Sequence, residues 1–223
     1  MKRFAIIAGG GSGQRMQMSQ PKQFVCINRL PVIMHTLKVF ASCVDEIILV
    51  LPATTMNLWN KLQLKYHFDI PHQLVAGGQT RFESIKNATQ HLPNNGLVAV
   101  HDAVRPCVSK ALIERCFSVA EKEKKNVIAA CKMIDSVRML TATGTQGLPR
   151  ENLMLVQTPQ VFACKTLKKA YQQSFIPQFT DDATVVEAMG ESICCVDGEY
   201  TNIKITVPND LKIAKQILTT KTI

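Results

Sequence analysis

Short runs of apolar, often β-branched residues alternate with amphipathic helical stretches along almost the whole chain. The runs that predict strands are Phe4–Ala8, Glu46–Leu51, Gln73–Val75, Leu97–His101, Val127–Cys131, Ser192–Val196 and Asn202–Thr206. The stretches that predict helices are Pro31–Phe40, Thr54–Tyr66, Arg81–Gln90, Ser109–Glu123, Cys164–Ser174, Thr184–Met189 and Asn209–Leu218. Apolar strands that are each followed by a helix are typical of a parallel sheet covered on both faces. We therefore predict an α/β fold with a Rossmann-like, mostly parallel sheet, helices on both faces, and ligands at the carboxyl ends of the strands.

The segment from about residue 133 to residue 159 interrupts this alternation. Its Thr- and Gly-rich centre is flanked by Val137–Leu140 and Leu153–Val156, which predict the two strands of a long, protruding β-hairpin. A hairpin that stands off the main sheet is marginally stable alone. We expect this arm to embrace a second copy of the chain in a homodimer, and the alternative is a surface excursion folded back on its own domain. No linker divides the rest, so residues 1–223 are expected to form a single domain with an arm.

The charge balance favours anionic partners. The chain has 26 Lys and Arg against 17 Asp and Glu, a net charge of +9 at pH 7, which suits nucleic acids or phosphorylated small molecules. Aromatic residues make up only 6% of the chain, and no basic stripe is interleaved with Phe or Tyr as a base-stacking surface requires. Phosphorylated small molecules are therefore favoured. A basic nucleic-acid-binding protein remains the alternative from a different functional class.

The eight cysteines form no C-x-x-C pair and no Cys/His spacing typical of a metal site. Most lie among apolar residues, which is typical of small core residues. Residues 1–3 precede an apolar run too short for the core of a secretory signal, and no stretch is long enough to span a bilayer. We expect a reducing, cytoplasmic environment and no membrane partner.

The first predicted strand runs into a glycine-rich loop, Ala8-Gly9-Gly10-Gly11-Ser12-Gly13-Gln14-Arg15-Met16, which is followed by Pro21-Lys22-Gln23. Glycines allow backbone N–H groups to approach a phosphate chain without a side-chain barrier. The spacing matches neither the dinucleotide fingerprint nor the mononucleotide P-loop, and a structural turn is the alternative for the glycines alone. Arg15 and Lys22 favour a nucleoside triphosphate, because preplaced cations stabilise the charge that develops during nucleotidyl transfer.

Further short motifs follow in a specific order. They are Gly77-Gly78 with Arg81 and Ser84, His101-Asp102-Ala103-Val104-Arg105-Pro106, Asp135-Ser136, Arg150, Gln157-Thr158-Pro159-Gln160, Thr180-Asp181-Asp182-Ala183 and Asn202-Ile203-Lys204-Ile205-Thr206. Together with the glycine loop they resemble the 2-C-methyl-D-erythritol 4-phosphate cytidylyltransferases, a family with the sugar-nucleotidyltransferase-like fold that acts in non-mevalonate isoprenoid biosynthesis. The resemblance runs almost from end to end of the chain.

The resemblance implies that CTP is the nucleotide donor and that Arg15 and Lys22 are catalytic residues. The residues that it implies in nucleotide binding are Ala8, Gly9, Gly10, Gly11, Gly13, Gly77, Gly78, Ser84 and Asp102. Asp102 is also implied to lie beside a divalent metal, and one carboxylate with phosphate oxygens and waters suits Mg²⁺. The local alternatives are a helix cap for Asp102 and a cap or packing role for Ser84.

The residues that the resemblance implies in acceptor binding are Arg105, Ser136, Arg150, Thr180 and Lys204. Ser136 stands where the family commonly has threonine, and the hydroxyl is retained. Arg150 lies in the arm and is implied to reach the substrate of the neighbouring subunit. The local alternatives are a surface ion pair for Arg105, a solvent-facing strand residue for Lys204 and a helix cap at Thr180. We expect His101 to be structural.

The loop start departs from the family pattern. The family usually has Pro-Ala-Ala-Gly where this chain has Ile7-Ala8-Gly9-Gly10, a variant also seen in ribitol 5-phosphate cytidylyltransferases. That acceptor is therefore the alternative within the same class. Residues 180–183 and the length of the chain favour 2-C-methyl-D-erythritol 4-phosphate. The implied reaction transfers CMP from CTP to this acceptor and releases pyrophosphate.

Overall fold

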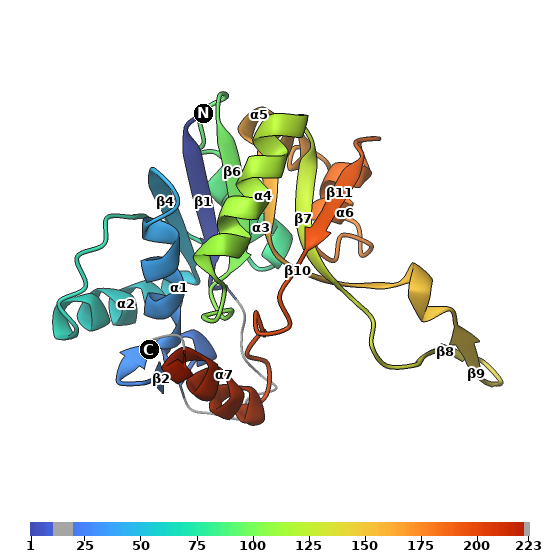
Figure 1. Cartoon of the computed structure of the whole chain (residues 1–223). Coiled ribbons are helices and arrows are strands. Elements are labelled where there is room, and N and C mark those ends of the chain that lie inside the picture. The colour runs from blue at the N-terminus through green and yellow to red at the C-terminus, as the bar shows by residue number, and fades with distance from the viewer. Residues whose placement is uncertain (11–19, 221–223) are drawn as a thin grey trace.

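The computed structural model describes residues 1–10 and 20–220. Its centre is a seven-stranded sheet with the strand order β11-β7-β10-β6-β1-β4-β5 (Figure 1). These strands are β1 (Arg3–Ala8), β4 (Glu46–Leu51), β5 (Gln73–Ala76), β6 (Leu97–Asp102), β7 (Asn126–Lys132), β10 (Met154–Ala163) and β11 (Ile193–Asp197). All neighbouring pairs are parallel except those of β10. The predicted α/β fold with a mostly parallel sheet is confirmed.

Strand β10 is the exception to the parallel arrangement. It runs antiparallel to both of its neighbours, β6 and β7. Its register with β7 shifts between Val156 and Gln160, and the Thr158–Pro159 peptide bond within this irregularity is cis. The sequence pattern does not indicate a strand at residues 157–163, because the polar and proline residues at 157–160 interrupt the apolar run.

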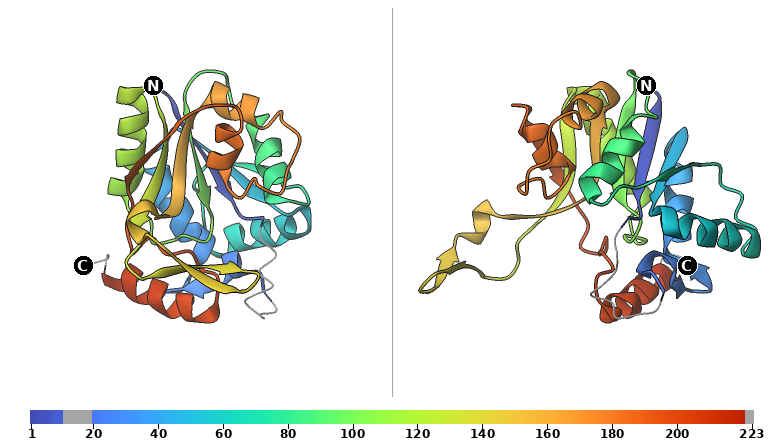
Figure 2. Two further views of the ribbon diagram at one scale, coloured as in Figure 1. Left: turned by 90° about the vertical axis from the view of Figure 1, so that its right-hand side faces the viewer. Right: turned by 180° about the vertical axis from the view of Figure 1, so that it is seen from behind.

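Helices cover both faces of the sheet (Figures 1 and 2). Helices α1 (Val32–Ala41), α2 (Ala53–Lys65) and α4 (Lys110–Glu123) share one hydrophobic cluster with the sheet, and α3 (Arg81–Thr89), α5 (Cys164–Ala170) and α6 (Asp182–Glu187) share another. Alternate residues of β1 enter the two clusters, with Ala5 and Ile7 in the first and Phe4 and Ile6 in the second. Burial on both faces explains why the strands are continuously apolar in sequence.

The predicted helices are confirmed, with ends displaced by one or two residues, except that α5 ends at Ala170 rather than at Ser174. Ser109 is the N-cap of α4 and accepts a hydrogen bond from the backbone N–H of Leu112 at 3.0 Å. Asp181 likewise caps α6 through the N–H of Thr184. Side-chain oxygens satisfy the open N–H groups at these helix ends.

A smaller layer lies beyond the carboxyl ends of the central strands (Figure 1). It contains the 3-10 helix η2 (Lys22–Phe24), the short pair β2 (Cys26–Ile27) and β3 (Leu30–Pro31), and helix α7 (Pro208–Thr220). A third hydrophobic cluster, which includes Ile27, Val104, Ile205 and Ala214, connects this layer to the sheet.

The prediction of a strand at Asn202–Thr206 is wrong. Within the described part of the chain this segment joins no β-ladder. It crosses the layer beyond the strand ends, where the N–H of Ile205 donates to the carbonyl oxygen of Val104 at 2.9 Å. Its alternating pattern reflects one buried side, Ile205, and one exposed side, Lys204, rather than membership of the sheet.

The arm stands well away from the sheet (Figures 1 and 2). It is a hairpin of β8 (Val137–Thr141) and β9 (Gly144–Leu148), followed by the 3-10 helix η3 (Arg150–Asn152). The first predicted strand of the arm is therefore confirmed. The assignment of Leu153–Val156 as its second strand is wrong, because Leu153 follows η3, and Met154–Val156 begin β10 and pair with β7. The Gly-rich stretch supplies the real partner strand, and its glycines concealed it from a propensity argument.

Five cysteines are buried, which agrees with their expected role as small core residues. Two of the others, Cys194 and Cys195, lie on β11.

Among the described residues, no helix has both the length and the apolar character needed to cross a membrane.

Candidate active site

The candidate site lies at the carboxyl edge of β1, β5 and β6. Ala8 and Asp102 end β1 and β6 and are direct partners in the parallel ladder between these strands. Gly9 and Gly10 continue from β1, and Gly77 continues from the end of β5. Neighbouring parallel strands bring their carboxyl ends to one edge of the sheet. Residues that are far apart in sequence are therefore gathered at this edge.

The described glycines of the site lie close to neighbouring side chains, which would have to shift to admit a larger residue. A Cβ on Gly9 would lie 2.6 Å from Cδ2 of Leu51, and a Cβ on Gly77 would lie 2.8 Å from Oγ of Ser84. A Cβ on Gly10 would also lie 3.3 Å from that Oγ. The end of β1, the end of β5 and helix α3 therefore meet at Ser84. Gly11, Gly13 and Arg15 lie outside the described residues.

Ser84 fixes the backbone of the segment that precedes α3. Its hydroxyl donates to the carbonyl oxygen of Thr80 at 2.8 Å and accepts from the N–H of Gly78 at 3.2 Å. Thr80, not Ser84, is the N-cap, and it forms a capping box with Glu83. This agrees with the packing alternative for Ser84 and leaves it in contact with the glycine loop.

Asp102 forms ion pairs with two cationic side chains of the site. Its Oδ2 lies 3.0 Å from Nζ of Lys204 and 3.3 Å from Nε of Arg105. Burial opposes the charged form of Asp102, but Lys204, Arg81 and Arg105 outweigh this effect and hold the pKa of the carboxyl well below its usual range. Asp102 is therefore a permanent anion, not an acid or base for proton transfer at neutral pH.

The two cations differ in exposure. The Arg105 side chain is 11% exposed, and its Nη1 also donates to the carbonyl oxygen of Asn202 at 2.8 Å. The Lys204 side chain is 42% exposed. Lys204 is thus more accessible to an anionic ligand than Arg105.

Lys22 contacts the chain segment that carries Lys204. It belongs to η2, is only 8% exposed, and donates from Nζ to the carbonyl oxygen of Ile205 at 2.9 Å. The adjacent Gln23 donates from Nε2 to the carbonyl oxygen of Gly9 at 2.9 Å. These two bonds connect η2 both to the glycine loop and to the segment that carries Lys204.

A partly buried ion pair, which has no local signal in the sequence, links α3 to α6. The guanidinium group of Arg81 contacts both carboxylate oxygens of Asp182, at 3.1 and 2.5 Å, and Asp182 is fully buried. Tyr171 donates its hydroxyl to the same carboxylate at 2.5 Å. Asp181 caps α6, and the neighbouring Thr180 is exposed before it. The sequence shows the adjacent Asp181 and Asp182, but no local pattern indicates that Asp182 contacts Arg81.

His101 is structural, as expected. It is fully buried, and burial lowers its pKa to about 3. Its Nε2 donates to the carbonyl oxygen of Arg105 at 3.3 Å, so its Nδ1 accepts from the hydroxyl of Thr158 at 3.0 Å. The neutral ring of His101, in this tautomer, connects β6 to β10 through its hydrogen bond with Thr158.

Two implied acceptor residues are not brought to this edge. Ser136 is exposed just before β8, and Arg150 lies in η3, where its Nη1 donates to the carbonyl oxygen of Ile134 at 2.6 Å. Both belong to the arm, which points away from the sheet (Figures 1 and 2). Within one chain, the site therefore contains Lys204 and Arg105 but not Ser136 or Arg150.

The residues present fit a metal ion that arrives with a ligand. Among the described residues, no group of three or more His, Cys, Asp or Glu side chains is arranged to hold a metal. Asp102 offers a single carboxylate, and both of its cation contacts are made through Oδ2, which leaves Oδ1 for another partner. Mg²⁺ commonly uses one or two carboxylates together with substrate phosphates and waters. Asp102 meets that requirement, whereas an all-protein cage is not formed here.

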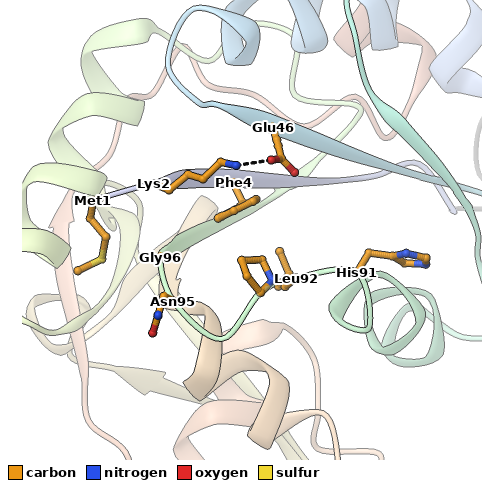
Figure 3. Close-up of a pocket in the computed structure, with 9 residues that line it drawn as sticks. Met1, Lys2, Phe4, Glu46, His91, Leu92, Asn95 and Gly96 are labelled. Carbon is orange, nitrogen blue, oxygen red and sulfur yellow. Dashed lines mark hydrogen bonds and ion pairs between the residues drawn. The ribbon is translucent and has the colours of Figure 1, made fainter.

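A separate pocket of about 610 Å³ lies at the opposite edge of the sheet. The residues that line it are Met1, Lys2, Phe4, Glu46, His91, Leu92, Pro93, Asn95 and Gly96 (Figure 3). These residues lie at or near the amino ends of β1, β4 and β6. The pocket is therefore distinct from the candidate site.

Comparisons with known proteins match the chain almost from end to end. The model of the family described as 2-C-methyl-D-erythritol 4-phosphate cytidylyltransferase matches residues 4–220. A protein of that name from Phocaeicola vulgatus is 46% identical over 220 residues, which cover 98% of this chain and 100% of the relative. One from Porphyromonas gingivalis is 45% identical, with 98% of each chain covered. The crystal structure of 4-diphosphocytidyl-2C-methyl-D-erythritol synthase from Anaerococcus prevotii superposes with a TM-score of 0.81 at 30% identity, covering 98% of both chains.

Proposed function

Because the chain belongs to the 2-C-methyl-D-erythritol 4-phosphate cytidylyltransferase family, we propose that it transfers CMP from CTP to 2-C-methyl-D-erythritol 4-phosphate in isoprenoid precursor biosynthesis. The match of the family model over residues 4–220 carries this proposal. The gathering of the glycine loop, Asp102 and Lys204 at one sheet edge supports it from the structure. The chain is accordingly a nucleotidyltransferase.

The nucleotide is proposed to bind along the glycine loop. Backbone N–H groups of residues 9–13 would face the triphosphate, and Lys22 and Arg15 would supply positive charge. Gly77, Gly78 and Ser84 would receive the cytosine base, since the absence of side chains exposes backbone groups to the base edge. Asp102 would hold a Mg²⁺ ion that neutralises phosphate charge when bound with the nucleotide.

The acceptor phosphate is proposed to attack the α-phosphorus of CTP in line. A bond forms between an acceptor phosphate oxygen and the α-phosphorus, while the bond from that phosphorus to the oxygen bridging the β-phosphate breaks. Pyrophosphate leaves with the electron pair. The attacking phosphate is already ionised at neutral pH, so no general base is required. Lys204, Arg105 and Thr180 would position it, and catalysis would depend on positioning and charge stabilisation.

The arm is proposed to complete the site of a second copy of the chain. Six large apolar side chains on or beside it are at least 39% exposed, namely Ile134, Met139, Leu140, Met154, Leu155 and Val156. Exposed apolar surface of this kind marks an interaction site. A homodimer with exchanged arms would cover it and would bring Ser136 and Arg150 to the partner's acceptor.

The activity is tested by measuring pyrophosphate release from each of the four nucleoside triphosphates with each of two acceptors. The proposal expects rapid release with CTP and 2-C-methyl-D-erythritol 4-phosphate, and slow or no release with ribitol 5-phosphate. Preference for ribitol 5-phosphate, or for another nucleotide, would contradict the assigned substrates. Salt-dependent retention on DNA or RNA without any pyrophosphate release would instead favour a nucleic-acid-binding protein.

A further inference from the structure

One short segment between β11 and α7, residues 202–205, is contacted by two cations of the candidate site and carries a third. Arg105 donates to the carbonyl oxygen of Asn202 at 2.8 Å, and Lys22 donates to the carbonyl oxygen of Ile205 at 2.9 Å. Lys204, which belongs to the segment itself, reaches the Asp102 carboxylate at 3.0 Å. The position of this segment therefore affects all three cations. We call it the crossing segment.

The crossing segment is not itself a strand of the sheet. It joins no β-ladder of the described chain, although the N–H of Ile205 donates to the carbonyl oxygen of Val104. Its other anchor is the fully buried side chain of Asn202, whose Nδ2 donates to Oε1 of Gln157 at 3.1 Å and to the carbonyl oxygen of Thr158 at 2.8 Å. The anchor is therefore the irregular part of β10.

The orientation of the Asn202 amide is fixed by its surroundings. Gln157 donates from Nε2 to the carbonyl oxygen of Glu199 at 2.8 Å and accepts from the N–H of Glu199 at 3.2 Å, so its own oxygen faces Asn202. Both neighbours of Asn202 Nδ2 are thus acceptors. The Oδ1 of Asn202 is buried and has no hydrogen-bond partner among the described residues. An unsatisfied buried acceptor is costly, so the stabilising contacts of this side chain are the two hydrogen bonds that it donates.

We propose that Asn202 and Gln157 are positioning residues for the transfer reaction, acting through Arg105, Lys204 and Lys22. This inference rests on the proposed function. The Asn202 amide fixes the crossing segment to β10, and the segment in turn places the cations relative to Asp102 and to the bound phosphates. Small displacements of positioned groups are expensive in catalysis, where a shift of about 1 Å can cost about 100-fold.

The test uses a double-mutant cycle between Asn202→Ala and Lys204→Met in the full-length protein. If Asn202 acts by positioning Lys204, Asn202→Ala should lower kcat/KM less in the Lys204→Met background than in the wild-type protein. Asn202→Ala should lower kcat/KM for both substrates by about tenfold or more, and the double variant should retain at least about fivefold more activity than the product of the single effects. A merely structural role would leave the two effects multiplicative.

Asn126→Ala is the matched control. Asn126 is also buried, at 8% exposure, and its Nδ2 donates to the carbonyl oxygen of Ser192 at 3.2 Å at the amino end of β7. We expect it to lower the melting temperature as Asn202→Ala does, to leave kcat/KM within about twofold of wild type, and to combine multiplicatively with Lys204→Met. If Asn202→Ala does not fold, Gln157→Met takes its place in the same cycle.

The wild-type protein is assayed first with CTP and 2-C-methyl-D-erythritol 4-phosphate. An inactive wild type would contradict the proposed function itself. An active wild type combined with multiplicative effects, or with normal kinetics in Asn202→Ala and Gln157→Met, would overturn the positioning role alone.

Discussion

One carboxylate oxygen of Asp102 forms ion pairs with Lys204, at 3.0 Å, and with Arg105, at 3.3 Å. This arrangement suits charge stabilisation rather than proton transfer, because the depressed pKa of Asp102 keeps the group ionised throughout the neutral range. A phosphate nucleophile needs no proton removed at that pH. The chemistry of the residues and the chemistry of the proposed reaction are therefore consistent.

Lys22 is the residue on which nucleotide activation is expected to depend most among the described cations. Lys22→Met retains much of the apolar stem but removes the ammonium group, so turnover should fall by about 100-fold or more while the fold persists. Steady-state kinetics and circular dichroism test this. The control is Lys125→Met, which removes an exposed lysine paired with Glu123 beyond the end of α4. Near-normal turnover of Lys22→Met would remove Lys22 from the catalytic machinery.

His101 should make the stability of the protein pH-dependent. Its folded pKa of about 3 lies below the value of 6.5 in the unfolded chain, so the unfolded state binds the extra proton between these values and stability falls as the pH falls below 6.5. At pH 5 this amounts to about 2 kcal/mol relative to neutral pH. Urea unfolding at pH 5 and pH 7 should show this loss in wild type and a loss smaller by that amount in His101→Gln. Equal losses in the two proteins would contradict the assignment of a neutral, buried His101.

The arm holds Ser136 and Arg150, the two residues that we propose bind the acceptor of a partner subunit, away from the rest of the site. Arg150→Ala should therefore raise the KM for the acceptor by about tenfold, the equivalent of one lost charge-assisted hydrogen bond, and change the KM for CTP much less. The control is Arg138→Ala on the same arm, because Arg138 is bonded within the hairpin to Thr145 at 2.7 Å. An unchanged acceptor KM in Arg150→Ala would exclude this residue from the site.

The whole molecule is expected to be a dimer in solution. Sedimentation at micromolar concentration should give about twice the chain mass of 24.7 kDa. Leu140→Asp should shift the protein toward monomers, because Leu140 is 84% exposed on the arm and its apolar surface would be buried by the partner. Leu64→Asp is the control, since Leu64 is similarly exposed, at 78%, on helix α2. A wild-type monomer would contradict arm exchange.

Much of this molecule could be predicted from the sequence, because strands buried on both faces give continuous apolar runs and helices give clear periods. The misassignments have physical causes. Polar and proline residues interrupt β10, glycines conceal β9, and the crossing segment alternates like a strand without pairing with one. Ala8, Gly77 and Asp102 could be placed together from the strand ends. The Arg81–Asp182 pair and the Asn202 anchor could not, because long-range partners leave no local signal.

The most direct test of the central claim is a crystal structure of the protein with CTP and Mg²⁺. We expect the triphosphate to lie against the glycine loop and the ammonium group of Lys22 to lie within hydrogen-bond distance of a phosphate oxygen. We expect the base to lie beside Gly77, Gly78 and Ser84. A nucleotide bound in the pocket at the amino ends of the strands, or a Lys22 side chain directed away from the phosphates, would contradict this claim.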